Sequence, residues 1–170
     1  LQLLNDGELL LPRRRKELTL LAYLARRPAQ CTTRTALATL FWGDRDDRHA
    51  RQSLRQALLV LRQGLGTALE AEGEEVRLEV GALEVDAIDF ESDVQAGRLA
   101  EATARWRGQF LEGQEDAGTE EFRDWVQVER EGLRGQFAEA SARLVEAARE
   151  RGAWTGCLSA AERWGRRTTE

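Results

Sequence analysis

Two short apolar runs at the start of the chain are separated by a turn signal. Residues 1–4 and 8–11 are rich in leucine and flank Asn5-Asp6-Gly7. Asp-Gly favours a tight turn because it tolerates a positive φ. The pattern predicts a β-hairpin that ends at Pro12.

Three stretches with helical spacing follow this hairpin. Their apolar positions recur every three or four residues, as expected for helices with one buried face. Pro28 closes the first stretch, Thr32 or Thr33 offers an N-cap to the second, and Gly66 ends the third as a C-cap. The spacing predicts helices over about residues 14–27, 33–42 and 47–65.

A second alternating segment comes after the third helix. Residues 76–80 and 83–85 alternate between apolar and polar around Gly81, which predicts a second hairpin. Hairpin, three helices, hairpin is the order of a winged helix-turn-helix domain. We therefore expect a winged-helix domain over residues 1–86.

The rest of the chain is predicted to be helical. From Ile88 onward every convincing segment has helical spacing, and the longest runs from Glu120 to about Gly152. Along this segment, residues at helical spacing form one stripe that is predicted to be buried, and Glu129 is its single polar member. Its other members are Phe122, Trp125, Leu133, Phe137, Ala140, Leu144 and Ala148. We expect the aromatic residues and Leu133 to pack against helices around Trp106 and Phe110, within an all-α domain over residues 87–170.

This helical part contains an approximate internal sequence repeat, here called the echo. Residues 99–106 resemble residues 137–144 at an offset of 38, and residues 158–164 form a weaker third copy. A period of about 34 to 40 residues is typical of stacked helix pairs of the tetratricopeptide type, although Ala/Glu/Arg-rich helices also match by chance. The predicted fold class is mainly α with small β-hairpins, a winged helix followed by a tetratricopeptide-like domain.

Charge is divided unevenly between the two parts. The net charge is −5, but residues 1–66 carry 12 Lys and Arg against 6 Asp and Glu, a net of +6, whereas residues 67–170 carry 13 against 24, a net of −11. Such asymmetry indicates a basic binding module joined to an acidic partner module. Ordinary solvated surface charge gives the same count.

Other classes of function lack their signatures. The sequence has no glycine-rich phosphate loop, no metal-ligand spacing and no nucleophile beside a base, so we expect neither an enzyme nor a cofactor or metal site. Cys31 and Cys157 lie far apart in the sequence, so we expect both to be free thiols. No apolar run approaches the roughly 18 residues that span a membrane and no signal segment opens the chain, so we expect a cytoplasmic protein. The lack of Met, even at position 1, suggests a trimmed start.

The third helix carries the candidate DNA-contacting surface. At about 100° per residue, its apolar residues fall in one arc and four arginines fall beside it within roughly 60°, followed by glutamines. No acidic residue lies between Arg48 and Gly66, whereas a solvated face would usually include glutamates for i,i+4 pairs. Because arginine fits guanine or phosphate and glutamine fits adenine, this stripe predicts a helix in the major groove. The expected base contacts are Arg51, Gln52, Arg55, Gln56 and Leu59.

Contacts to the DNA backbone are expected from basic residues and helix N-termini around this stripe. They are Arg13, Arg14, Arg15, Thr33, Arg34, Arg48, Arg62 and Arg77. The run from Arg13 to Lys16 is equally consistent with a tolerated surface cluster. Leu59 and Val60 would touch thymine methyl groups, or pack on the second domain or another subunit. His49 has no metal-binding or catalytic-triad partner in the sequence, so we expect it to be a surface or capping histidine.

Several runs resemble one family of regulators. Residues 18–25 (LTLLAYLA), 40–42 (LFW), 50–58 (ARQSLRQAL) and Leu61-Arg62 resemble the OmpR-type winged helix of the antibiotic-regulatory-protein (SARP) activators. The bacterial transcriptional activation domain that follows it is similar to Val85-Asp86 with Asp89-Phe90-Glu91, residues 108–113 (GQFLEG), residues 121–126 (EFRDWV) and Glu129-Arg130. The resemblance implies a bacterial activator that binds repeats in double-stranded promoter DNA through its third helix, as a homodimer or in tandem, and recruits RNA polymerase.

Two departures from the family pattern affect this interpretation. The candidate wing, residues 67–85, holds six acidic residues and only Arg77 as a base. The helical domain is shorter than the family pattern, which predicts a fragment of a longer regulator. The acidic wing favours a second hypothesis, a protein-interaction module whose winged helix no longer binds DNA, while the acid-free stripe of the third helix opposes it.

Overall fold

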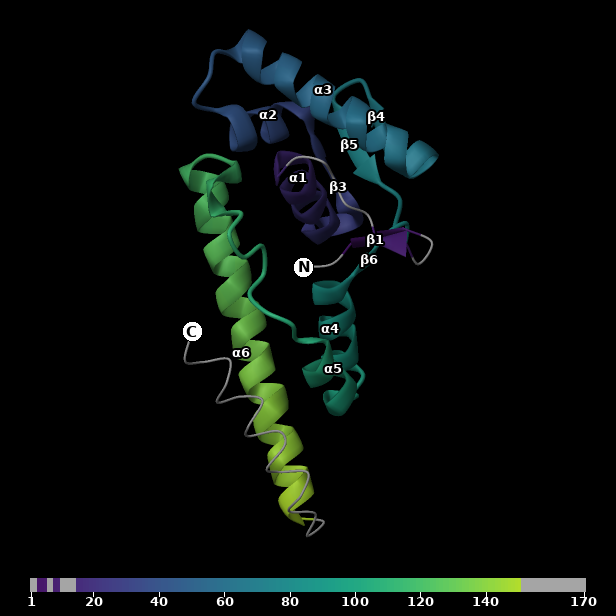
Figure 1. The fold of residues 1–170 in the computed structure, drawn as a ribbon, viewed down its shortest axis with the longest axis vertical. Helices are drawn as coiled ribbons and strands as arrows, with labels where there is room; N and C mark the ends of the chain where they lie inside the picture. The colour runs from purple at the N-terminus through teal and green to yellow at the C-terminus, as the bar shows by residue number, and fades with distance from the viewer. Residues whose placement is uncertain (1–2, 6–7, 10–14, 151–170) are drawn as a thin grey trace. The chain divides into compact units, whose positions relative to one another are not determined.

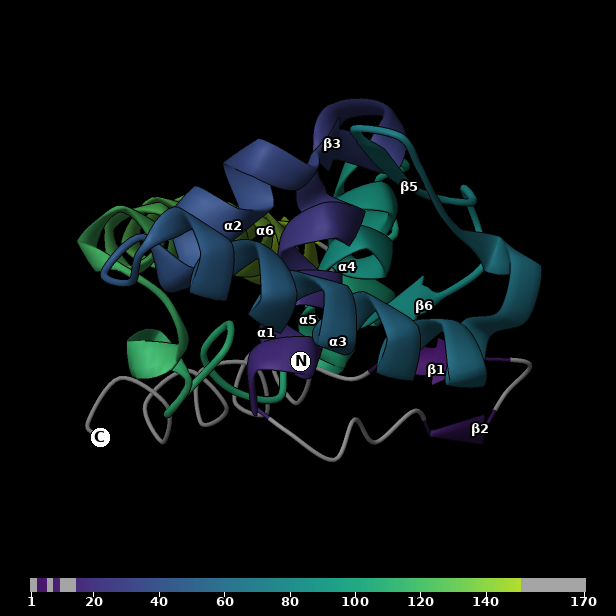
Figure 2. The ribbon, with the colours of Figure 1, turned by 90° about the horizontal axis from the view of Figure 1, so that it is seen from above.

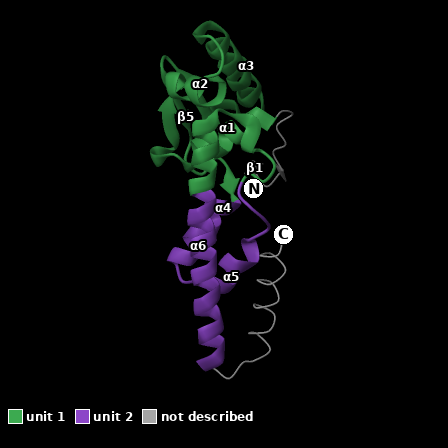
Figure 3. Cartoon of the chain, turned by 90° about the vertical axis from the view of Figure 1, so that its left-hand side faces the viewer, with its two compact units in different colours: residues 1–85, 111–128 green, residues 86–110, 129–170 purple. Residues whose placement is uncertain are grey.

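The computed structural model describes residues 3–5, 8–9 and 15–150, and it is mainly helical with two small antiparallel sheets (Figure 1). The chain forms two compact units, coloured separately in Figure 3. Unit 1 comprises residues 1–85 and 111–128, and unit 2 comprises residues 86–110 and 129–170. Among the described helices, none has the length and apolar character needed to cross a membrane.

The three predicted helices of unit 1 are confirmed as α1 (Arg15–Arg26), α2 (Arg34–Trp42) and α3 (Asp47–Leu65). Local signals set their ends. The Thr33 hydroxyl accepts a hydrogen bond from the N–H of Ala36 and caps α2, as the sequence predicts. Gly66, with φ +58°, ends α3. Short 3-10 turns follow α1 (η1, Pro28–Gln30) and α3 (η2, Gly66–Ala68).

Two three-stranded sheets flank these helices. In the first, β1 (Leu3–Asn5) pairs antiparallel with β2 (Glu8–Leu9) and with β6 (Glu84–Val85). The pairing of β1 with β2 confirms the predicted first hairpin, although its turn lies outside the described residues. In the second, β5 (Glu75–Leu78) lies between β3 (Cys31–Thr33) and β4 (Leu69–Glu72).

The predicted hairpin around Gly81 is wrong. The hairpin of the structure joins β4 to β5 through Gly73 and Glu74, with Glu72 opposite Glu75. Gly73 has φ +53°, a conformation that suits glycine in a tight turn. The sequence after Gly81 continues into β6, which pairs with β1 in the other sheet. Ala71 is the weak apolar position of β4, so periodicity alone did not identify this strand.

Residues 111–128 complete the core of unit 1. They include a 3-10 turn, η3 (Glu115–Ala117), and the first residues of α6 (Glu120–Glu150). Phe122 is fully buried, with its ring centroid 4.8 Å from that of Phe41. The ring of Trp125 lies 4.8 Å from that of Tyr23. Helices α1 and α2 thus supply aromatic partners for both residues, and their packing around Trp106 and Phe110 stays a prediction.

Unit 2 consists of α4 (Asp86–Gln95), α5 (Leu99–Arg105) and the remainder of α6. The Phe137 ring lies 4.6 Å from the Trp106 ring, which confirms that part of the predicted packing. Phe90 contacts the same indole at 5.6 Å. The predicted helices are confirmed, while the third copy of the echo lies outside the described residues.

A buried carboxylate joins α4 to α5 in unit 2. The side chain of Asp93 is 5% exposed and accepts hydrogen bonds from Arg105 Nε at 2.6 Å and Arg98 Nε at 2.8 Å. These two guanidinium groups hold the pKa of Asp93 below its usual value. The ion pairs connect α4 to α5 and the segment before it.

Candidate nucleic-acid interface

Helix α3 has one buried face and one exposed face. Its buried residues are those that the helical wheel assigned to the core, Leu54, Ala57, Leu58, Leu61 and Leu65, together with Ala50. Figure 2 shows the opposite side of α3 uncovered along its length. The packing of the leucine face therefore fixes the direction in which the polar stripe projects.

The predicted base-contacting residues all lie on the exposed face. Side chains of the N-terminal half line one shallow groove, namely Asp47, Arg48, Arg51, Gln52, Arg55 and Gln56. Leu59 follows them and is 53% exposed, so it is not used in the core of unit 1. The structure thus brings together all five candidate base contacts on one helix.

Most arginines of α3 are free to bind an anion. Arg48, Arg55 and Arg62 are exposed, and no ion pair joins them to another described residue. Arg51 is paired with Asp47 at 3.6 Å across one helical turn, and both side chains are largely exposed. Because exposed pairs of this kind contribute about 0 to 1 kcal/mol, a phosphate or a base could replace Asp47 at small cost.

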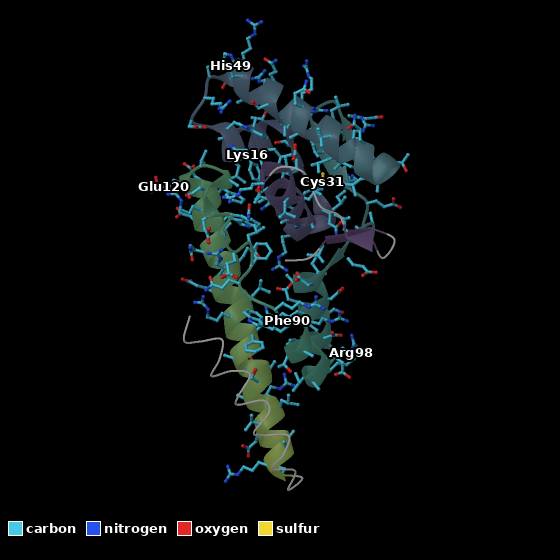
Figure 4. All side chains as sticks on the ribbon, in the orientation of Figure 1. Lys16, Cys31, His49, Phe90, Arg98 and Glu120 are labelled. Atoms are coloured by element: carbon cyan, nitrogen blue, oxygen red, sulfur yellow. The ribbon has the colours of Figure 1, made fainter. Side chains whose placement is uncertain are left out.

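The N-terminal end of α3 is held by a cap. The Asp46 carboxylate accepts a hydrogen bond from the backbone N–H of His49, and His49 Nδ1 lies 2.5 Å from Asp46 Oδ2. These contacts lower the pKa of Asp46. His49 is the predicted capping histidine, and Figure 4 labels it near the start of α3. The cap fixes where the arginine stripe begins.

The basic cluster at the start of α1 divides into two roles. Arg13 and Arg14 lie outside the described residues. Arg15 is exposed and lines a groove together with His49 and Gln52 of α3. The ammonium of Lys16 instead donates to the carbonyl of Phe41 at 2.5 Å and lies 5.0 Å from the centre of the Trp42 ring.

The Lys16 contacts are favourable because the C-terminal carbonyls of a helix attract cations, and the indole face does so as well. Burial lowers the pKa of this lysine. Lys16 therefore serves to hold α1 against α2, and Arg15 is the described member of the cluster that remains available to DNA.

The N-terminus of α2 already holds an anion. The Thr35 N–H donates to the carboxylate of Glu74 at 2.7 Å. The predicted phosphate contacts, Thr33 and Arg34, are also engaged, since Thr33 caps the helix and Arg34 Nη2 donates to the carbonyl of Ala71 at 2.8 Å. Sequence reasoning missed Glu74, because only the β4–β5 turn brings it to α2.

The wing hairpin is acidic and its arginine is paired. Arg77 forms a short ion pair with Glu75, whose carboxylate also accepts a hydrogen bond from the thiol of Cys31 at 2.8 Å. This hydrogen bond raises the pKa of Cys31, a free cysteine as predicted. All six acidic side chains of the candidate wing are exposed, namely Glu70, Glu72, Glu74, Glu75, Glu79 and Glu84. Within the described ranges, these and other residues form no cluster suited to a metal ion.

The comparison with protein families agrees with this geometry. Residues 8–81 match the family described as "Transcriptional regulatory protein, C terminal", the OmpR-type winged-helix domain, which is a DNA-binding family and not an enzyme family. No match to the chain was found among curated proteins or among solved structures. The matched segment spans the three helices and both strands of the wing hairpin. This match supports a DNA-binding transcriptional regulator whose winged-helix domain lies within residues 8–81.

Proposed function

We propose that this regulator is a sequence-specific transcription activator of the bacterial cytoplasm that recognises promoter repeats through the exposed face of α3. The observation that carries the proposal is the exposed stripe of arginines and glutamines on one side of that helix, in which Arg48, Arg55 and Arg62 have no ion pair with the described residues. Arginine and glutamine form paired hydrogen bonds with guanine and adenine edges in the major groove. A stripe with both residue types is suited to discriminate between base pairs.

Depth along α3 divides the roles of its side chains. Recognition helices usually place their N-terminal half deepest in the groove. We assign base contacts to Arg51, Gln52, Arg55, Gln56 and Leu59. Backbone contacts are assigned to Arg48 and Arg62 on the same helix and to Arg15 from α1, all of them exposed.

Residues 87–170 are proposed to contact RNA polymerase, as the resemblance to the activation domain of SARP activators implies. Support comes from the helical pairing of unit 2, in which Phe90 and Phe137 contact Trp106. The echo between residues 99–106 and 137–144 supports a tetratricopeptide-like arrangement. Transcription from a promoter that carries the selected DNA site, with and without the chain, tests this role; unchanged transcript levels would exclude activation by this chain.

The test of DNA recognition begins with selection of a duplex from a random pool by the full chain. Fluorescence anisotropy then compares the selected duplex with a scrambled one, and we expect a preference of at least about 10³. A variant with Arg51→Ala, Arg55→Ala and Arg62→Ala should lose that preference. A matched variant with Arg134→Ala, Arg143→Ala and Arg149→Ala, exposed on α6, loses the same charge and should keep it.

A second candidate function has one observation in its favour. The wing carries exposed carboxylates, and its Arg77 is paired with Glu75, so the usual wing contact with DNA is weakened. This favours a protein-interaction module whose winged helix has lost DNA binding. If the chain and its α3 variants bind the selected and scrambled duplexes alike, this second function replaces the first.

A further inference from the structure

The turn of the wing hairpin places a carboxylate at the N-terminus of α2. Glu74 accepts two hydrogen bonds there: its side chain accepts from the N–H of Thr35 at 2.7 Å, and its backbone carbonyl accepts from the N–H of Arg34 at 2.8 Å. The hydroxyl of Thr33 accepts a hydrogen bond from the N–H of Ala36. The first three N–H groups of α2 are therefore all satisfied within the chain.

The surroundings of this carboxylate are basic. Glu74 lines a groove with Arg34, Thr35, Arg51, Leu54 and Arg55, so it lies beside the predicted base-contacting arginines of α3. Hydrogen bonding from Thr35 is the main cause that lowers the pKa of Glu74, and the charges of Arg51 and Arg34 act in the same direction. The carboxylate is thus kept ionised among cations.

Free N–H groups at a helix N-terminus, with arginines close by, are the arrangement that binds a phosphate of the DNA backbone. A carboxylate presents the same charge sign and the same kind of acceptor oxygen. We propose that Glu74 is an internal competitor for the DNA backbone: it occupies the Thr35 N–H and the vicinity of Arg34 and Arg51, where a DNA phosphate would otherwise bind. The inference rests on the proposed DNA-binding function.

Two properties follow from this position. Because Glu74 is exposed in a two-residue turn, a phosphate can displace its side chain without opening the core. Because backbone contacts carry no sequence information, the competitor lowers the affinity for every duplex alike. Its effect is to limit occupation of random DNA while the base contacts of α3 are unchanged.

The test compares Glu74→Gln with Glu72→Gln in the full chain. Both changes add one unit of net charge to the same hairpin, but only Glu74 contacts α2, and the carboxylate of Glu72 has no hydrogen bond or ion pair to the described residues. Glutamine at position 74 can still accept from Thr35 in the free protein, so α2 keeps its cap, but the neutral amide is a weaker acceptor than the carboxylate and is displaced more readily by a phosphate. Glu74→Asp is a third variant, which keeps the charge but shortens the reach of the carboxylate.

We expect Glu74→Gln to bind a random-sequence duplex roughly threefold to tenfold more tightly at low salt. The slope of log affinity against log salt should steepen by about 0.9, as one added phosphate contact requires. Glu74→Asp should also bind more tightly than the parent, and Glu72→Gln should change affinity by less than about twofold, without the added slope. Thermal melts of all variants verify that they are folded.

Three results would overturn the proposal. Equal tightening by Glu74→Gln and Glu72→Gln would mean that only overall charge matters. Unchanged affinity and slope in Glu74→Gln and Glu74→Asp, with folded protein, would mean that Glu74 is a helix cap alone. If the parent and all variants bind no duplex, the DNA-binding function itself fails, which distinguishes that outcome from the first two.

Discussion

The exposed face of α3 and the wing hairpin are two neighbouring surfaces of one domain with opposite electrostatic character. On α3, Arg48, Arg55 and Arg62 have no ion pair with other described residues. On the wing, Arg77 is paired with Glu75, and Glu74 occupies the N-terminus of α2. The difference teaches that pairing within the chain, as well as the number of basic groups, decides where an anion can bind.

This contrast concentrates DNA recognition on a single helix. A winged helix usually adds backbone or minor-groove contacts from its wing to those of the recognition helix. Here the wing presents six carboxylates to solvent, and like charges repel at short range. We therefore expect the affinity to depend strongly on α3 and weakly on the hairpin.

The largest effect is expected from Phe122→Ala, which removes support from α2, the helix on which α3 packs. Phe122 is fully buried against Phe41 of α2, and α2 packs on α3 in the same core. Loss of a buried phenylalanine costs about 3 to 5 kcal/mol of the free energy of unfolding, measured by urea titration. Val128→Ala on the same helix is the control, since Val128 is 67% exposed and should cost at most about 0.5 kcal/mol. Equal costs for the two variants would contradict the packing.

A smaller but more specific loss is expected from Arg55→Ala on α3. A paired hydrogen bond to a base contributes about 1 to 3 kcal/mol of discrimination, so affinity for the selected duplex should fall while affinity for scrambled DNA changes little. Arg143→Ala, exposed on α6, is the charge-matched control. Equal weakening on both duplexes would move Arg55 from the bases to the backbone.

The sequence predicted α3 correctly and the wing hairpin incorrectly. The signals for a helix are local in the sequence, whereas strand pairing joins distant segments. Helix α3 is defined by local features, its leucine face and the Gly66 cap, and both were predicted correctly. Gly81 was mistaken for the hairpin turn because Ala71 weakens the alternation of β4. Local sequence patterns do not indicate which strand a segment will pair with.

The same limit applies to α6. Its stripe was predicted as one continuous buried face, and Phe137 does pack on Trp106. Phe122 and Trp125 belong to the same stripe but contact Phe41 and Tyr23. Helical periodicity gives the buried side of a helix, but it does not name the partner. The Glu74 contact with α2 was missed for the same reason, since 39 residues separate it from Thr35.

Arg62→Ala is expected to weaken binding to all duplexes alike. Arg62 lies in the last turns of α3, where a recognition helix leaves the groove and meets the backbone. Loss of one phosphate contact should lower the slope of log affinity against log salt by about 0.9. A salt series on selected and scrambled duplexes measures both quantities. Loss of preference at one base pair would instead show that Arg62 contacts a base.

The smallest effect is expected from Arg77→Ala in the wing. Because Glu75 already pairs with Arg77, its removal should change affinity for random DNA by less than about twofold and leave the salt slope within about 0.3 of the parent's, well short of the loss of one phosphate contact.

The partner of Arg77 provides the sharper form of this experiment. In a Glu75→Gln background the guanidinium is released, so Arg77→Ala should then cost as much affinity as Arg62→Ala and lower the salt slope by the same amount, about 0.9. The double-mutant cycle isolates the contribution of the pair, and thermal melts control for loss of the Cys31 hydrogen bond to Glu75. If Arg77→Ala alone matches Arg62→Ala, the wing arginine contacts DNA despite its carboxylate partner, and the contrast between the two surfaces is lost.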